Sequence, residues 1–596
     1  MNISWSCILF ISVLLLKLSN GLCQNKSKAN EKVSIDISIR GFNKVEIQIK
    51  GKEKFRMIRQ PVQGMRPEHG FTDKANVELQ GFQSKAVTVI QDTLPVSLAE
   101  VVYRYVLINK VGDTLASVKT SRNKWPQELL PELILPGRLP WVKLYNKAWE
   151  LNWHQIASSA ALPARFSHNV TPDNGRSYLW DASFSILFQR YAAPSGADPA
   201  IATLDNFYGQ QQPDGYILRY FTVKDYAAGH DTSKEKATIE AVNPPLLAWG
   251  EWNYFEISAD YKRLEMVLPG LIKQYHFIES FLQKEPGKYI WDGNPSGWDN
   301  IRNKARHKFW VELPAMQALS ARYISKIAAI LHQPEIERKF TSEYEQKKSA
   351  MELYWNADKQ WYCSIGDDGK FTQKTLSGMW PVLAGIVPRK NMPGIVANLL
   401  DVAKFSTSAM PLPTLAKDEN GYNSKGEYWL GSVWINMSLI TIRSLKANGY
   451  EKEAFDLAVK TLNGISRVYE NWSPKPHTLW ECYAPEFAAP ASHKVKPDLG
   501  SVRSDFAGWT ACLINLLIEN VMGIEVSAVS NTISWNIALV EEHGIKKLRF
   551  GKVNTDLLKK GRLILVRSNY SYTLKITIRD QQKTFKVEPG NNRFEI

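Results

Sequence analysis

The chain has 596 residues, of which 44% are hydrophobic and 22% are charged. These values are typical of a multi-domain globular protein, because a single core seldom extends beyond about 250–300 residues. The formal net charge of +15 comes from scattered Lys and Arg, without a basic block or a zinc-finger or RNA-binding motif. The composition therefore argues against a nucleic-acid partner and leaves an anionic glycan open.

The first 23 residues resemble a secretory signal peptide. The apolar run from Trp5 to Leu16 is too short to cross a bilayer core of about 30 Å, and no later segment is long and apolar enough to span it. We expect cleavage after Gly21 or Cys23 and export to the periplasm or the exterior. Cys23 leaves a lipid anchor open, although no small residue directly precedes it, and no integral membrane partner is implied.

Residues 24–130 are predicted to form an N-terminal β-sandwich domain. The segments "VSIDISI" and "KVEIQIK" alternate apolar and polar residues with a period of two, and "AVTVI" and "EVVYRYVLI" are rich in β-branched residues. Alternation of this kind places one face of each strand in a core and the other in solvent.

Residues 131–523 are predicted to form a helical catalytic domain. Apolar residues follow helical spacing in about ten to twelve segments, separated by loops that hold Gly, Pro and Trp. Helix pairs over this length favour an all-α (α/α)6 toroid. An open α-solenoid is the alternative, but the sequence shows no fixed-period repeat. The clearest segments are 177–192, 243–258, 266–283, 309–333, 339–356, 392–402, 432–449, 451–470 and 506–523.

Strand patterns return in residues 524–596, which are predicted to form a small C-terminal β domain. The segments "TISWNIAL", "IKKLRFG", "GRLILVRS" and "YTLKITIRD" carry the signal. Outside the leader the cysteines are Cys363, Cys482 and Cys512, an odd number at wide spacing that indicates neither a disulfide framework nor a zinc site. A calcium ion in a loop remains open.

The chain contains 20 Trp, and several stand beside carboxylates in loops at helix starts. Aromatic rings stack on the apolar faces of sugars, although large cores use them too. In a toroid the loops at one rim converge on a funnel, so we expect functional groups there. The candidates for sugar contact or chemistry are Trp180, Asp181, Trp298, Asp299, Tyr428, Trp429, Trp434 and Glu481.

Hydrolysis of a glycosidic bond needs two carboxyl groups on opposite sides of the sugar. One must carry a proton at neutral pH, and an adjacent Trp raises a carboxyl pKa by lowering the local polarity. Asp299 beside Trp298 fits the general acid, and Glu481 then fits the base that activates water. The plain alternatives are a helix cap for Asp181, a capped turn for Asp299 and a structural hydrogen bond for Glu481.

The motifs "SGWDN", "EYWLGSVWIN", "ECYAPE" and "SDFAGWTA" together resemble glycoside hydrolase family 63, its mannosylglycerate-hydrolase-like branch and, more remotely, the trehalases. The similarity covers residues 165–523. It implies an inverting, exo-acting α-glycosidase on an (α/α)6 barrel that cleaves an oligosaccharide or small glycoside without a cofactor. By motif, Asp299 and Glu481 match the family's general acid and base. Matches to the innermost sugar subsite and its aromatic lining are Trp180, Asp181, Trp429 and Trp434.

This chain departs from the family pattern near the site. Leu430 and Ser432 stand where the family usually has Arg and Pro, and Cys482 and Ala484 replace two Asn. The catalytic Glu is retained, so the departures leave the chemistry in place and put the identity of the substrate in doubt.

Two other hypotheses stay open. A different toroid enzyme, such as a polysaccharide lyase or an unsaturated uronyl hydrolase, would suit the basic net charge and would use a His, for which His230 and His477 are candidates. A non-catalytic glycan-binding protein would use the same aromatic loops but would not require both Asp299 and Glu481.

Overall fold

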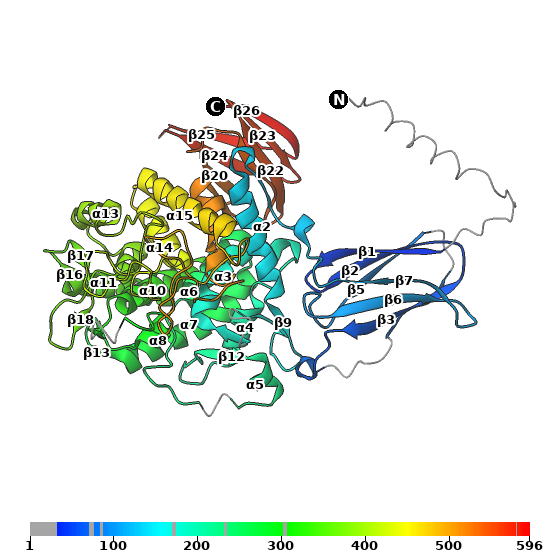
Figure 1. Ribbon diagram of the computed structural model, residues 1–596, viewed down its shortest axis with the longest axis horizontal. Coiled ribbons are helices and arrows are strands. Elements are labelled where there is room, and N and C mark those ends of the chain that lie inside the picture. The colour runs from blue at the N-terminus through cyan, green and yellow to red at the C-terminus, as the bar shows by residue number, and fades with distance from the viewer. Residues whose placement is uncertain are drawn as a thin grey trace, which may run out of the picture.

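The computed structural model describes residues 33–70, 77–83, 87–169, 175–231, 235–301, 307–579 and 581–596. Two β-rich regions, one near each end of the described chain, pack against a central helical region (Figure 1). The predicted signal peptide and Cys23 lie outside the described residues. Within the described ranges, no helix combines the length and the apolar composition that crossing a membrane requires.

The N-terminal region consists of two antiparallel sheets with strand orders β1-β2-β5 and β4-β3-β6-β7. Their strands are β1 (Ser34–Gly41), β2 (Lys44–Lys50), β3 (Phe55–Gln63), β4 (Val77–Gln83), β5 (Val87–Thr93), β6 (Val102–Ile108) and β7 (Thr114–Lys119). In β2, Val45, Ile47 and Ile49 are buried while the intervening residues are partly or fully exposed, as the alternation predicts. These side chains share a core with Tyr103 and Tyr105 of β6, so the two sheets pack face to face.

The central region is mainly helical, and consecutive helices α6 and α7, α10 and α11, and α14 and α15 contact each other. Its helices are α2 (Leu139–His154), α3 (Leu179–Gln189), α4 (Ala202–Tyr208), α5 (Val223–Ala227), α6 (Leu247–Ser258), α7 (Tyr261–Leu282), α8 (Gly293–Ser296), α10 (Glu312–Ile330), α11 (Pro334–Ala350), α12 (Trp380–Ala384), α13 (Met392–Leu400), α14 (Ile435–Ala447), α15 (Glu451–Asn471) and α16 (Leu513–Asn515). Short two-stranded pairs lie between them: β9 (Ile156–Ser158) with β10 (Phe166–His168), β11 (Arg176–Tyr178) with β12 (Tyr220–Thr222), β13 (Gln283–Glu285) with β14 (Lys288–Tyr289), β15 (His307–Phe309) with β18 (Ile365–Gly366), and β16 (Trp355–Asn356) with β17 (Trp361–Tyr362). Helix pairs are thus present, and their closure into a six-hairpin toroid stays a prediction.

Two details differ from the sequence expectation. The segment 506–523, expected as one helix, is divided into a 3-10 turn (Thr510–Cys512), α16 and a π-helical stretch, η10 (Leu516–Val521). Helix α2 was not among the predicted segments, although Trp141, Leu144, Tyr145, Ala148 and Trp149 follow helical spacing along its buried face.

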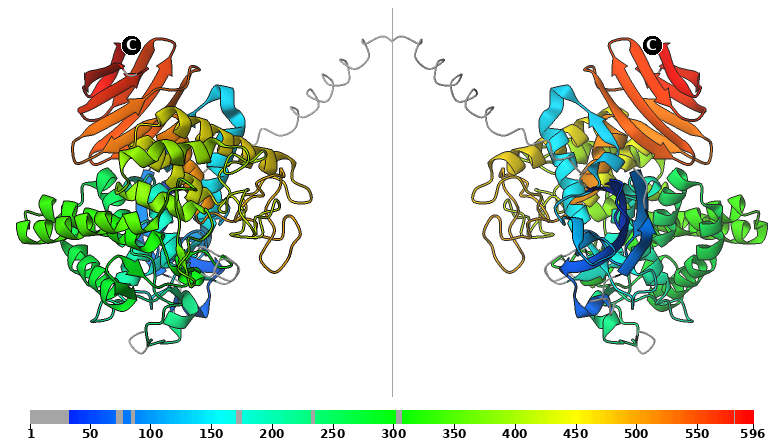
Figure 2. Two further views of the ribbon diagram at one scale, coloured as in Figure 1. Left: turned by 90° about the vertical axis from the view of Figure 1, so that its left-hand side faces the viewer. Right: turned by 90° about the vertical axis from the view of Figure 1, so that its right-hand side faces the viewer.

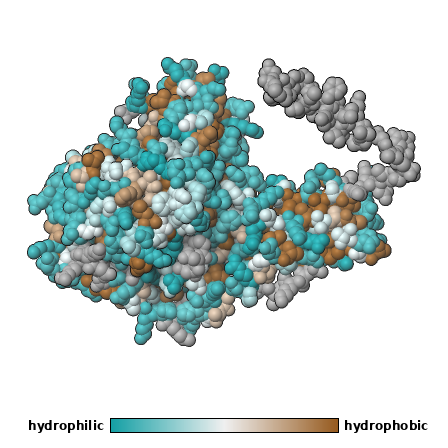
Figure 3. Space-filling model, in the orientation of Figure 1, coloured by the Kyte–Doolittle hydropathy of each residue, from teal (hydrophilic) through white to brown (hydrophobic). Residues whose placement is uncertain are grey.

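The C-terminal region also consists of two sheets, with orders β19-β20-β24-β25 and β26-β23-β22-β21-β8 (Figure 2). Strand β8 (Glu132–Ile134) comes from the segment before α2 and pairs with β21, so the second sheet joins residues about 410 positions apart. The other strands are β19 (Ile524–Ser527), β20 (Thr532–Asn536), β21 (His543–Phe550), β22 (Val553–Lys560), β23 (Leu563–Ser568), β24 (Tyr572–Ile578), β25 (Gln581–Val587) and β26 (Gly590–Glu595). In the face that Figure 3 presents, both β regions show hydrophobic patches between hydrophilic side chains.

A buried ion-pair cluster ties together the helices that lead to the site. Glu519 of η10 accepts hydrogen bonds from Arg190 at the end of α3 (2.9 Å) and from Arg443 of α14 (2.6 Å). Burial alone would raise the pKa of Glu519, but the two guanidinium groups lower it to about 2. Because Glu519 is the acid that both guanidinium groups share, its removal would leave two partly or fully buried cations without their counter-ion, and breaking a buried ion pair typically costs about 3–5 kcal/mol.

Candidate active site

Segments that are far apart in the chain meet at one cavity of about 290 Å³. Of the eight residues selected from the sequence, seven line it: Trp180, Asp181, Asp299, Tyr428, Trp429, Trp434 and Glu481. Trp180 and Asp181 begin helix α3, and Trp434 immediately precedes α14. The other four lie in loops or turns of the helical region, as expected for groups that must face a ligand.

The Asp299 loop follows the short helix α8 and passes directly over Trp180. Gly297 makes this approach possible, because it has φ +83° and a Cβ there would lie 2.8 Å from the Trp180 ring. Any other residue would be strained in the backbone and would collide with the indole. The Gly in "SGWDN" therefore places Asp299 at the cavity.

Asn300 fastens the Asp299 loop to the aromatic loop more than 120 positions later. Its side-chain amide donates to the carbonyl of Glu427 (2.7 Å), and its amide oxygen accepts a hydrogen bond from the backbone N–H of Trp429 (3.0 Å). Glu427 and Tyr428 both adopt positive φ, at 32° and 62°. A non-glycine residue pays about 1–2 kcal/mol for that conformation, so the clamp from Asn300 offsets local strain.

Glu481 is fully buried at the base of the cavity, and its carboxylate has three donors. Arg503 approaches with its guanidinium at 2.8 Å and its backbone N–H at 3.3 Å, and the Tyr428 hydroxyl donates at 3.0 Å. Burial raises the pKa of Glu481 above its ordinary value, and Arg503 and Tyr428 limit that rise. The environment therefore holds a carboxylate in one orientation in a site where little water surrounds it.

Asp299 has different surroundings from those expected. Its carboxylate is one-fifth exposed and pairs with the Lys494 ammonium at 2.7 Å. Trp298, expected to form an apolar wall and to contact sugar, is fully buried, and its ring packs against Trp429 with 4.8 Å between ring centroids. Trp298 does not line the cavity, so it supports the aromatic wall from behind.

The aromatic wall of the cavity is a stack of Trp429 and Trp434. The two rings are nearly parallel, at 7°, with centroids 4.1 Å apart. Tyr428 meets Trp434 edge to face, and the indole N–H of Trp434 donates to the Tyr428 carbonyl at 3.2 Å. The two rings are almost fully buried, so the stack gives the cavity a fixed apolar wall.

Asp181 is a third carboxyl group at the cavity. It is 4% exposed, and burial raises its pKa well above its ordinary value, with the charges of Glu481 and Asp299 adding to the rise against Arg219. A carboxyl group whose neutral form is favoured can donate a hydrogen bond to a ligand oxygen. Asp181 is not the N-cap of α3, because Tyr178 holds that position and Asp181 is the third residue of the helix.

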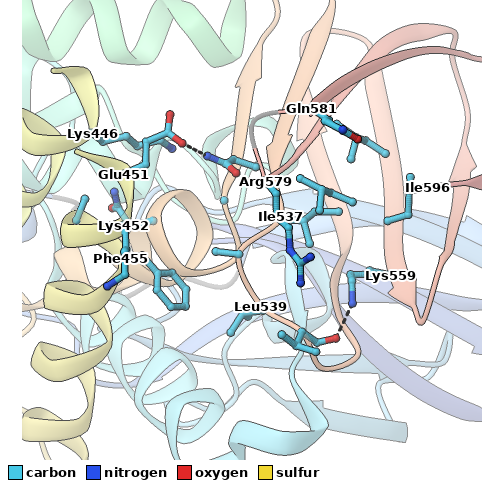
Figure 4. A pocket seen from close by; sticks show the side chains of 18 of the residues that line it. Lys446, Glu451, Lys452, Phe455, Ile537, Leu539, Lys559, Arg579, Gln581 and Ile596 are labelled. Carbon is cyan, nitrogen blue, oxygen red and sulfur yellow. Dashed lines mark hydrogen bonds between the residues drawn. The ribbon is translucent and has the colours of Figure 1, made fainter. Parts of the chain in front are cut away.

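A larger cavity, of about 1120 Å³, lies between α15 and the C-terminal sheets (Figure 4). Its acidic side chains are committed to neighbours: Asp456 pairs with Lys452 at 2.7 Å, and Glu451 accepts from Asn536 at 2.6 Å. Phe455 is the one aromatic side chain among the described residues that line it. The larger cavity thus lacks the features of the smaller one, whose lining combines three carboxyl groups with two stacked indoles.

Comparison with known proteins agrees with this geometry. Residues 176–494, more than half of the chain, match the family model of the mannosylglycerate hydrolase MGH1-like glycoside hydrolase domain. The chain belongs to this glycoside hydrolase family. The matched segment contains both candidate catalytic carboxylates and ends at Lys494.

This glycoside hydrolase also resembles individual proteins. It is 26% identical over 461 residues to an uncharacterized protein of Borreliella burgdorferi, an alignment that covers 75% of this chain and 95% of the relative. It is 23% identical over 226 residues to a probable mannosyl-oligosaccharide glucosidase of Schizosaccharomyces pombe, covering 35% of this chain and 26% of that protein. A solved structure named sialidase shares the fold with a TM-score of 0.60 at 11% identity, covering 93% of this chain and 61% of the other.

Several residues of the hydrolase cavity were not selected from the sequence. Trp509 lies within the motif "SDFAGWTA" and Arg503 directly precedes it, and Trp509 donates its indole N–H to the Glu481 carbonyl at 2.9 Å. Lys494 lies in "SHKVKPD", where no local pattern marks it. With Leu430 fully buried in place of the usual Arg, the guanidinium beside Glu481 comes from Arg503.

The His residues considered for a lyase lie elsewhere. His477 is exposed near Glu470, and His230 is exposed beside Glu235. His493 does line the cavity, with its ring against Tyr428 at 4.9 Å. In the described part of the chain, no group of three or more His, Cys, Asp or Glu residues is arranged to hold a metal ion.

Proposed function

We propose that this glycoside hydrolase is an exo-acting, inverting α-glycosidase of the α-glucosidase or α-mannosidase type. Its substrate is the terminal α-linked sugar of an oligosaccharide or small glycoside. The observation that carries this proposal is that Asp299 and Glu481, from two distant loops, line one small cavity with a stacked-indole wall. A cavity of about 290 Å³ suits one sugar ring and part of the next, which favours action at a chain end.

The two environments support different roles for the carboxyl groups. Glu481 is fully buried and held by Arg503, so it can accept a proton from a water molecule bound deep in the cavity. Asp299 is one-fifth exposed, so its carboxyl group can exchange a proton with solvent and meet a leaving group. We assign Asp299 as the general acid and Glu481 as the general base, with carboxyl groups about 6.5–9.5 Å apart in the substrate complex.

The wider proposal draws on the relatives and on the sequence. The similarity to a probable mannosyl-oligosaccharide glucosidase supports a glucosidase as one of the two sugar types. We infer that the paired helices close into an (α/α)6 toroid with these loops at one rim. We further propose that residues 1–23 direct export to the periplasm or the exterior, with a lipid anchor on Cys23 as the alternative.

The direct test follows hydrolysis by proton NMR with a panel of maltose, trehalose, α-1,2-mannobiose and α-mannosylglycerate. We expect one member to release a terminal sugar whose first observed anomer is β, because water attacks from the face opposite the α-linked leaving group. A first product in the α form would replace the inverting mechanism by a retaining one. Binding of a panel sugar without turnover would favour a glycan-binding protein.

A second expected result concerns Tyr428→Phe. The Tyr428 hydroxyl donates to Glu481 and so opposes the rise in pKa that burial causes. Its removal should raise the Glu481 pKa further, and a general base works only when ionised. The acid limb of the kcat–pH profile should therefore move about one unit to higher pH, the equivalent of one hydrogen bond to a charged group.

Tyr422→Phe is the matched control, because that hydroxyl donates to Glu486, outside the cavity, at 2.8 Å. The profile of this variant should match that of the unmodified enzyme. If Tyr428→Phe leaves the acid limb in place, Glu481 is not the group whose ionisation limits turnover at low pH.

A further inference from the structure

The Asp299–Lys494 ion pair favours an ionised carboxylate, whereas a general acid must carry a proton. The Lys494 ammonium donates to Asp299 Oδ2 at 2.7 Å, and its Nζ lies 5.3 Å from the centroid of the Tyr428 ring. A carboxylate that accepts from an ammonium group has no proton to give to a glycosidic oxygen. Between the empty cavity and the reacting complex, Lys494 has to leave Asp299 and a proton has to arrive.

Lys494 is carried by a tight turn at the cavity rim. The backbones of His493 and Lys496 close it with two hydrogen bonds of 3.1 Å, and Ser501 accepts from the His493 N–H at 2.8 Å. The preceding Ser492 accepts from the backbone N–H of Tyr428 at 2.9 Å and of Glu427 at 3.0 Å. The backbone of Lys494 is thus anchored, while its side chain is a flexible stem that can swing without moving the turn.

The two carboxylates hold their cations in different ways. Arg503 reaches the fully buried Glu481 through both its guanidinium and its backbone N–H, so it is fixed in place. Lys494 makes one hydrogen bond to a carboxylate that is one-fifth exposed. The two cationic side chains are about equally exposed, so the difference lies in the number of contacts and in the burial of the carboxylate. A pair of this kind is weak, because water screens the two charges and holding the long lysine stem in one position costs entropy, so a substrate can displace it.

We propose that Lys494 is a positioning residue that pairs with Asp299 in the empty cavity and is displaced when substrate binds. This inference rests on the proposed role of Asp299 as the acid. On displacement Asp299 takes one proton from solvent and gives it to the glycosidic oxygen as the bond to the anomeric carbon breaks. Water forms the new bond and gives its proton to Glu481, which returns it to solvent, and Lys494 pairs again after product leaves.

Several other charged and titratable groups line the cavity with Asp299 and contribute to its electrostatic environment. Besides Lys494 they are Asp181, Arg219, Tyr428, Glu481, His493 and Arg503. Arg503 already binds Glu481. If Lys494 is removed, Asp299 loses the cation that contacts it, while the carboxyl groups of Asp181 and Glu481 remain nearby. Any effect of that loss should appear in the alkaline limb of the free enzyme's pH profile.

The test compares Lys494→Met with the unmodified enzyme on the panel disaccharide that is hydrolysed fastest. The alkaline limb of kcat/KM reports the free enzyme, and that of kcat reports the substrate complex. We expect Lys494→Met to move the kcat/KM limb about one unit to higher pH and to leave the kcat limb unchanged, because Lys494 has already left in the complex. Lys494→Arg, which keeps the charge, should retain the original limb.

Lys496→Met is the matched control, because Lys496 belongs to the same turn but does not line the cavity. Its two limbs should stay in place. The proposal is overturned if, in Lys494→Met, the alkaline limbs of the kcat and kcat/KM pH profiles move together or if neither moves. Lys494→Gln is the second variant if the Met variant does not fold. Asp299→Asn separates the proposed role of Asp299 from the proposed role of Lys494. If Asp299→Asn retains activity, Asp299 is not the general acid. If Asp299→Asn loses activity but the pH profiles of Lys494→Met do not move, only the role proposed for Lys494 is contradicted.

Discussion

Asp299→Asn should lower kcat for the panel disaccharide by roughly 10²–10⁴-fold, the usual contribution of a general acid. Asparagine has nearly the same size and can hydrogen-bond, but it cannot give a proton to the leaving oxygen. A 2,4-dinitrophenyl glycoside of the same sugar leaves with little protonation, so its hydrolysis should fall much less. Initial rates on both substrates, measured at the pH optimum, give the ratio that identifies the acid.

Asp498→Asn is the control for this experiment. Asp498 is exposed in the same rim loop as Lys494 and does not line the cavity, so its replacement should leave both rates unchanged. An equal fall on the two substrates in Asp299→Asn would mean that Asp299 acts by binding and not by proton donation.

Glu481→Gln should lower turnover by a similar factor, roughly 10²–10⁴-fold, irrespective of the leaving group. The glutamine cannot take a proton from water, and that step is needed for good and poor leaving groups alike. Azide needs no deprotonation, so it should partly restore turnover of the dinitrophenyl glycoside and yield a β-glycosyl azide from an α-linked substrate. The product is identified by NMR, which checks both the rescue and the face of attack.

Glu486→Gln serves as the control, because Glu486 follows Glu481 closely in the chain but pairs with Lys417 on the surface. Dependence on the leaving group in Glu481→Gln, without such dependence in Asp299→Asn, would show that acid and base are assigned the wrong way round. Full activity of both variants would remove the carboxylate pair from the mechanism.

Much of the local structure could be predicted from the sequence because it depends on neighbouring residues. The alternation in "KVEIQIK" places Val45, Ile47 and Ile49 in a core, and β2 occupies this segment. Helical spacing over 451–470 corresponds to α15. The predictions were weaker where packing overrides the local pattern, as in 506–523, where the chain winds into a π-helical stretch around the buried Glu519 ion pairs.

The residues of the candidate site also differ in whether the sequence alone reveals them. Asp299, Glu481 and the Trp-rich loops could be selected because unusual residues stand together in short motifs. The partner of Asp299 could not, since Lys494 lies 195 positions away in a stretch without a distinctive pattern. The position of Trp298 next to Asp299 predicts a ligand contact, but neighbouring residues in a loop point in different directions, and the Trp298 ring packs against Trp429.

Most strand and helix segments, the family resemblance and the two carboxylates on which the chemistry is proposed to depend can be recognised in the sequence. These properties reside in residue types and in spacings of a few positions. The tertiary structure alone decided which cation each carboxylate meets, Arg503 for Glu481 and Lys494 for Asp299. It also decided that β8 completes a sheet at the other end of the chain. Ion pairs and strand pairing join groups through space, and their partners follow from how the whole chain packs.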